Sequence, residues 1–238
     1  MTNLSVNINK IATLRNARGG DTPNVIQFAL DCERFGANGI TIHPRPDERH
    51  ITRADAVKLS QVILTELNIE GYPDERFMDL VAVCKPKQAT LVPDPPHVLT
   101  SNAGWELEEN SAFLSPIISK LKKMKIRVSL FVGTDLKQIG LAASLGADCI
   151  ELYTGPYADA NHADREKIME AYTKAANFAI SLDLAVNAGH DLNSENLAFF
   201  KSKMPSLAEV SIGHALIADA LYLGIEKTIS VYKSALTD

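Results

Sequence analysis

The chain has 238 residues, of which 46% are hydrophobic and 22% charged, and its formal net charge at pH 7 is −5. This composition is typical of a globular protein and excludes a mainly disordered chain, while the acidic balance argues against a nucleic-acid or anionic-membrane partner. Since there is no apolar run of membrane-spanning length, no basic-then-apolar leader and no CxxC pair among Cys32, Cys84 and Cys149, we expect a soluble, cytoplasmic protein without disulfides or a thiolate zinc site.

Eight short runs rich in β-branched residues recur along the chain, and each is followed by a helical pattern. The runs are 4–9, 39–43, 67–70, 89–93, 126–132, 149–154, 184–188 and 209–213. Their starts lie 22 to 37 residues apart, which is the length that a strand–helix–strand unit needs. The pattern predicts an α/β protein, a single (β/α)8 TIM barrel formed by residues 1–238 as one domain. An open, doubly wound sheet is the structural alternative.

Helix signals stand between the runs. Thr22 can cap and Pro23 can open a first helix that Gly36 ends, and the apolar spacing inside it turns Cys32 toward the core. Further along, Asp135 can cap a helix over 136–145, and the longest helical pattern covers 159–182.

One loop, 94–105, is unusually long and rich in Pro, Gly and small polar residues. It carries the only tryptophan of the chain, together with His97, whose role the sequence leaves undecided. Loops of this length in a compact domain are commonly lids or binding loops, and we expect that role here.

The active site of such a barrel forms at the carboxyl ends of the strands. Counting His97 of the long loop, five of the six histidines and two glutamates gather at these ends, which indicates an enzyme. The ends carry, in chain order, Asn7, Asn9, Lys10, His43, Arg45, His50, Glu70, Asp94, Thr100, Glu151, Asn187, His190, Gly213 and His214.

Several of these residues could instead have a purely structural role. His43 could be a satisfied core histidine, and Glu70 a structural carboxylate paired with an arginine. Glu151 lies between two apolar strand residues, so it points into the barrel, where it could be catalytic or could pair with Lys10 or an arginine.

Two phosphate-type sites are indicated. The loops 188–190 and 212–215 place glycine amides beside a helix start, where barrels often hold phosphate. The first loop offers Arg15 and Arg18, joined by Arg45, although both loop arginines could instead be solvated charges. Four residues could also ligate a metal, but no HxH or HExxH spacing supports a metal site, and we expect none.

Longer motifs in the chain resemble the pyridoxine 5′-phosphate synthase family. They are residues 6–19, 39–50, 153–158, 186–190 and 212–214, and the match runs from about Val6 to the final helix. The resemblance implies a (β/α)8 transferase, typically a homo-octamer, with no cofactor. Such an enzyme condenses 1-deoxy-D-xylulose 5-phosphate with 3-amino-2-oxopropyl phosphate, giving pyridoxine 5′-phosphate, phosphate and water.

The resemblance also implies residue roles. His43 and Glu70 would be general bases, His190 a general acid, and Glu151 would stabilise charge in a transition state. The aminoketone phosphate would be held by Asn7, Arg18, Asp191, Gly213 and His214. The deoxyxylulose phosphate would be held by Arg45, His50 and Thr100, together with Asn9 and Lys10.

The chain departs from the family pattern at two places. Many members carry Asp-His where this chain has Asn9-Lys10, and Gly where it has Asp191. One alternative is a phosphosugar aldolase or epimerase on the same barrel, which would act through a Schiff base on Lys10 or through a metal ion. A non-catalytic barrel that only binds phosphorylated metabolites is the remaining alternative.

Overall fold

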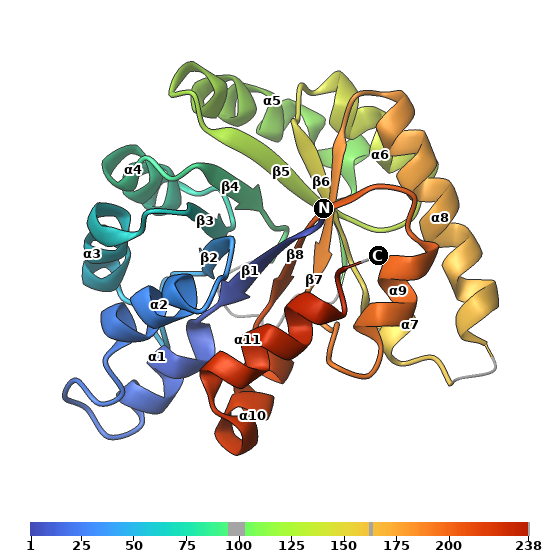
Figure 1. Ribbon diagram of the computed structural model, residues 1–238. Coiled ribbons are helices and arrows are strands. Elements are labelled where there is room, and N and C mark those ends of the chain that lie inside the picture. Colours follow the sequence, from blue (N-terminus) through green and yellow to red (C-terminus); the bar gives the residue numbers. More distant parts are fainter. Residues whose placement is uncertain (95–102, 162–163, 238) are drawn as a thin grey trace.

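The computed structural model describes residues 1–94, 103–161 and 164–237, in which eight parallel strands form a closed barrel (Figure 1). Each strand pairs with the next in the sequence, and β8 pairs with β1 to close the sheet. This confirms the predicted (β/α)8 fold and rules out the open sheet. The strands are β1 (Asn3–Asn7), β2 (Gly39–Ile42), β3 (Glu66–Gly71), β4 (Gln88–Leu91), β5 (Arg127–Val132), β6 (Cys149–Leu152), β7 (Ala185–Gly189) and β8 (Leu207–Ile212).

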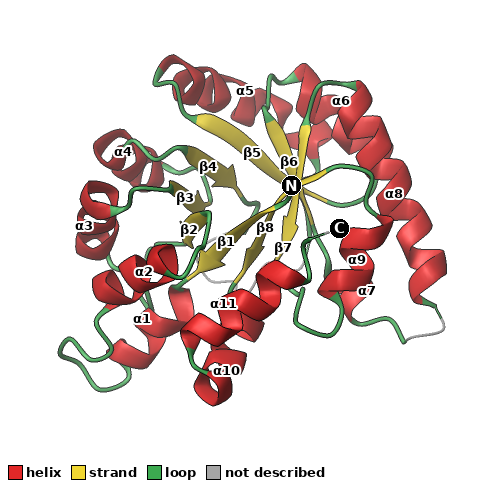
Figure 2. Cartoon of the chain, viewed as in Figure 1, coloured by secondary structure: helices red, strands yellow, loops and turns green. Residues whose placement is uncertain are grey.

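Helices surround the barrel on its outside (Figure 2). They are α1 (Asn9–Asn16), α2 (Val25–Arg34), α3 (Arg53–Val62), α4 (Glu75–Cys84), α5 (Leu107–Lys123), α6 (Leu136–Ser144), α7 (Gly155–Ala158), α8 (Arg165–Ser181), α9 (Leu197–Lys203), α10 (His214–Leu223) and α11 (Ile225–Ser234). Across the described ranges, none of these helices combines the length and the apolar character that crossing a bilayer requires.

The local signals fix some helix ends and miss others. Asp135 caps α6 as predicted, since its side chain accepts a hydrogen bond from the Lys137 amide. The cap of α2 is Asn24 rather than Thr22, because the Asn24 side chain accepts from the Gln27 amide. The predicted helix over 159–182 begins only at Arg165, and α1 was not predicted.

The inside of the barrel is polar, which is unusual, because branched apolar side chains commonly fill such barrels. Apolar residues of each strand pack outward against the helices, while polar ones alternate with them and are buried. Contacts between strands that are not neighbours cross the interior. The Gln88 side chain on β4 donates to Glu209 on β8 at 3.5 Å and accepts from Asn187 on β7 at 3.4 Å. The buried polar residues of the strands include Ser5, Thr41, Asn68, Gln88, Thr90, Ser129, Asn187, Glu209 and Ser211.

Candidate active site

Glu70 lies at the carboxyl end of β3, in contact with residues from the first two strands. Its Oε2 accepts a hydrogen bond from Asn7 Nδ2 at 3.4 Å and lies 3.8 Å from His43 Nδ1. Burial, with a further contribution from the charge of Glu209, raises the pKa of Glu70 to about 8. A carboxylate with such a pKa is a much stronger base than an exposed glutamate, and it lies at the barrel mouth.

The backbone of His43 is fixed by Asn7, at the end of β1, and Asn9, at the start of α1. Asn9 Oδ1 accepts a hydrogen bond from the His43 amide at 2.9 Å, and Asn7 Oδ1 accepts one from the Asn9 amide at 3.1 Å. Burial, followed by the nearby charge of Arg45, lowers the pKa of His43 well below its usual value. The imidazole is therefore neutral near pH 7, and Asn9 has a clear function in fixing its backbone.

Glu151 points into the barrel from β6, as predicted, and is only 4% exposed. Burial and the charges of Glu70 and Glu209 raise its pKa well above the usual value, which favours the protonated form of the carboxyl group. Glu209 was missed by the sequence analysis, and burial raises its pKa to about 7. The alternation of polar and apolar residues along β8 could have identified it.

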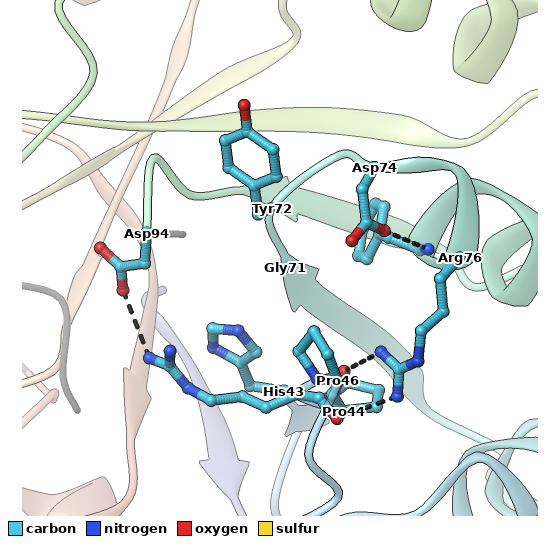
Figure 3. Close-up of a pocket in the computed structure, with 10 residues that line it drawn as sticks. His43, Pro44, Pro46, Gly71, Tyr72, Asp74, Arg76 and Asp94 are labelled. Atoms are coloured by element: carbon cyan, nitrogen blue, oxygen red, sulfur yellow. Dashed lines mark hydrogen bonds and ion pairs between the residues drawn. The ribbon is translucent and has the colours of Figure 1, made fainter. Parts of the chain in front are cut away.

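Arg45 and its loop are fixed by two residues that were not predicted to do so. The Arg45 guanidinium lies 3.3 Å from Asp94 Oδ2, and both side chains are buried. Arg76 donates to the carbonyls of Pro44 at 3.1 Å and of Arg45 at 2.9 Å (Figure 3). These groups border a small hollow that His43 also lines. The arrangement presents a positioned cation beside the candidate base.

The two arginines of the first loop have different surroundings. Arg15 belongs to α1 and forms two hydrogen bonds with Asp55, at 2.6 and 2.8 Å. Its guanidinium also donates to the His50 carbonyl at 3.3 Å, so it orders the segment that carries His50. Arg18 is exposed, as is Lys10 in the first turn of α1.

His50 is buried beside the same segment. Its Nδ1 accepts a hydrogen bond from the Ile51 amide at 3.0 Å, which leaves Nε2 as the protonated nitrogen of the neutral ring. Burial and the charge of Arg45 lower its pKa to about 4. His50 is therefore a neutral hydrogen-bonding group near pH 7.

His190 follows β7, where the chain turns sharply. Gly189 is required there, because a Cβ atom on it would lie 2.0 Å from the Ser211 carbonyl oxygen. His190 itself has a φ of 24°, and its Nδ1 lies 2.9 Å from Asp191 Oδ1. The hydrogen bond to Asp191 is the largest cause of a raised His190 pKa.

The end of β8 approaches β1 closely. A Cβ atom on Gly213 would lie 3.0 Å from Asn7 Cβ, so the glycine brings the start of α10 against the candidate site. His214 is the first residue of α10 and is exposed. The amides of a first helical turn have no partner within the helix and favour anions.

The structure thus gathers Asn7, Asn9, His43, Arg45, Glu70, Glu151 and His190 by direct contacts or by electrostatic interactions. Thr100, His97 and His162 lie outside the described residues. Within the described part of the chain, no group of three or more His, Cys, Asp or Glu side chains is placed to hold a metal ion.

The chain is similar to known proteins in sequence and in fold. A family model described as pyridoxal phosphate biosynthesis protein PdxJ matches residues 4–238. Proteins named pyridoxine 5′-phosphate synthase from Parabacteroides distasonis and Porphyromonas gingivalis are each 58% identical over 236 residues, covering 99% of both chains.

Among solved structures, tryptophan synthase from M. tuberculosis is similar with a TM-score of 0.66 and 10% identity, covering 100% of this chain and 93% of the other. Phosphoribosylanthranilate isomerase from Thermotoga maritima is similar with a TM-score of 0.61 and 14% identity, covering 99% and 98%. The last two similarities concern the fold alone.

Proposed function

Because the chain belongs to the family of the pyridoxal phosphate biosynthesis protein PdxJ, we propose that its barrel mouth carries out the reaction named in the curated members, pyridoxine 5′-phosphate synthesis. The chain is an enzyme, a transferase. Its reaction condenses 1-deoxy-D-xylulose 5-phosphate with 3-amino-2-oxopropyl phosphate, giving pyridoxine 5′-phosphate, phosphate and water.

The observation that supports this assignment most is the contrast in protonation at the mouth. The reaction consists of imine formation, dehydrations and ring closure, which are successive proton transfers. With a pKa of about 8, Glu70 is mostly protonated at pH 7, and its ionised minority is a strong base; neutral His43 can also accept a proton. His190, with its pKa raised beside Asp191, is suited to donate one.

Glu151 takes a related role in this proposal. Its raised pKa favours the protonated carboxyl group, which can donate a hydrogen bond to an oxygen on which negative charge develops. Its charge interacts with those of both Glu70 and His190, which supports a place for it in the same site as the base and the acid. Glu70 and His43 then act from the side of β2 and β3.

The two phosphates are assigned to the two sides of the mouth. The aminoketone phosphate is held by Asn7 and Arg18, by Gly213 and His214 at the start of α10, and at Asp191. The deoxyxylulose phosphate is held by Arg45 and His50, with Asn9 and Lys10, and by Thr100. The backbone amide of Asp191 is not free to bind this phosphate, because it already donates a hydrogen bond to Thr154 Oγ1 at 3.3 Å.

Replacing Arg45 with methionine is expected to weaken binding of the deoxyxylulose phosphate about 30-fold and to change binding of the aminoketone phosphate by less than about twofold. A charge-assisted hydrogen bond to phosphate contributes roughly 1.5–3 kcal/mol, while the second phosphate lies on the other side of the mouth. Isothermal titration with each substrate alone measures both constants. An equal loss for the two substrates would contradict separate subsites.

Assembly and compartment are further parts of the proposal. From the family resemblance we propose a homo-octamer that works in the cytoplasm. Leu221, Tyr222 and Leu223 at the end of α10 are 72%, 90% and 52% exposed, and such an apolar group is suited to an interface. Sedimentation of the purified protein tests the octamer, and a stable monomer at micromolar concentration would contradict it.

The activity is tested by mixing the purified protein with both phosphates and following product absorbance together with released phosphate. We expect equal amounts of pyridoxine 5′-phosphate and inorganic phosphate. Binding of both substrates without any product would contradict the proposed function.

A further inference from the structure

His190 and Asp191 are consecutive residues whose side chains bond to each other at the barrel mouth, with 2.9 Å between His190 Nδ1 and Asp191 Oδ1. We propose that Asp191 is a positioning residue that fixes His190 in one tautomer and favours its protonated form for proton donation to the substrate. This inference rests on the proposed function, because it concerns the acid of that reaction.

The chemistry of the pair fixes the position of the proton. An ionised carboxylate can only accept hydrogen bonds, so Nδ1 of His190 must carry a hydrogen. The proton that a charged imidazole then gives up is the one on Nε2. A neighbouring carboxylate orients catalytic histidines in the same way in other enzymes, where it also stabilises the imidazolium.

His190 offsets the energetic cost of burying part of the Asp191 carboxylate. Asp191 Oδ2 is buried and has no hydrogen-bond partner among the described residues, so Oδ1 with its bond to His190 is the one satisfied oxygen. A buried carboxylate oxygen without a donor is costly, and that cost is reduced when the adjacent imidazole is positively charged. A positively charged His190 therefore compensates the neighbouring carboxylate better than a neutral ring would.

The backbone holds His190 in a conformation that a residue with a side chain rarely adopts. His190 has a φ of 24°, a left-handed value that is unfavourable for a residue with a side chain. Thr154 Oγ1 donates to the Gly189 carbonyl at 2.7 Å and accepts from the Asp191 amide at 3.3 Å, and Asn196 donates to the Asp191 carbonyl at 3.3 Å. Such strain persists where the surroundings impose it, often at functional sites.

Other charged groups face the pair and must be considered. Glu151 on β6 and Asp94 after β4 both act on His190 in the same direction as Asp191, while burial opposes all three. Of these carboxyl groups, Asp191 has the largest influence, through its hydrogen bond. Tyr153 faces Asp191 and Asp159.

The test combines a titration and a rate measurement on Asp191→Asn. The asparagine oxygen can still accept from Nδ1, so this change removes the charge and retains the shape. NMR titration of 13C-labelled histidine, with His190→Gln to assign the signal, should show a lower pKa for His190 in the variant. Asp191→Ala, which also removes the acceptor, should lower the His190 pKa further. The neutral ring should then no longer be restricted to the tautomer with its proton on Nδ1.

The ratio of variant to wild-type kcat should then depend on pH in a defined direction. Below both His190 pKa values the acid is protonated in either protein, so the ratio is near its maximum. As pH rises the variant loses the proton first, and the ratio should fall about fivefold between about pH 6 and pH 9, the order expected for one partly exposed ion pair. A purely structural defect would lower kcat by the same factor at every pH.

Asp159→Asn is the matched control. It removes an exposed carboxylate that also faces Tyr153, and it should leave both the His190 titration and the rate ratio unchanged. An unchanged His190 pKa in Asp191→Asn would overturn the inference, and so would a lowered pKa with a flat rate ratio. If the wild-type protein made no product, the proposed function would fail, and the titration would still decide whether Asp191 holds the proton on His190.

Discussion

Replacing Glu70 with glutamine is expected to lower kcat about 1,000-fold, within the range that a general base contributes, while KM for either phosphate changes only a few fold. The amide retains the shape of the carboxyl group and can still interact with Asn7. It cannot accept a proton from the substrate, so the loss falls on the chemical step. Steady-state kinetics with each substrate varied in turn separates the two constants.

The same substitution at the other end of the same strand provides the control. Glu66 lies at the start of β3 and pairs with Arg127. Glu66→Gln should leave kcat within a few fold of wild type, since this pair is remote from the carboxyl end of the strand. A Glu70→Gln enzyme with near-normal kcat would show that another group is the base.

Replacing Asp55 with asparagine is expected to destabilise the fold by about 3 kcal/mol, because it leaves Arg15 charged and buried without its partner. The two side chains are only 10% and 12% exposed and share two hydrogen bonds. For a chain of this length the loss corresponds to a melting temperature lower by roughly 6–12 °C. Reversible urea unfolding monitored by circular dichroism measures the free energy directly.

The effect of Asp55→Asn should depend on pH with a known sign. Burial opposes ionisation of Asp55, but the bond to Arg15 and the bonds from Thr52 outweigh it and lower the Asp55 pKa. The stabilisation is therefore present above the unfolded-state pKa of about 4 and is lost as pH falls through the folded-state value. Wild type and variant should converge in stability in acid.

An exposed ion pair gives the comparison for this prediction. Asp31 and Arg34 are three residues apart on α2, and the arginine is 68% exposed. Asp31→Asn should change the free energy of unfolding by less than about 0.5 kcal/mol. A similar loss from both substitutions would contradict the special role of the buried pair.

The architecture could be predicted because the spacing of the β-branched runs can be read directly along the sequence and does not depend on distant contacts. The positions of His43, Glu70 and His190 at strand ends followed from that spacing together with the fold. The prediction was less successful where local signals compete, as at Asn24, which caps α2 in place of Thr22. The polar α1 also escaped detection, because its residues carry little apolar periodicity.

The partnerships among side chains could not be predicted in the same way. Asp55 meets Arg15 across 40 positions, and Asp94 meets Arg45 across 49. Such distant contacts depend on how the strands and loops pack, which no local pattern specifies. Glu209 likewise influences Glu70 and Glu151 only because three strands face one polar interior.

The central claim is that burial in this polar barrel turns Glu70 into a base that titrates near neutral pH. NMR titration of the protein labelled with 13C at the glutamate side-chain carboxyl tests it most directly, with Glu70→Gln identifying the signal. We predict that the Glu70 carboxyl titrates with a pKa of about 8. A Glu70 carboxyl that titrates in the usual range of an exposed glutamate, about 4.3, would contradict the account.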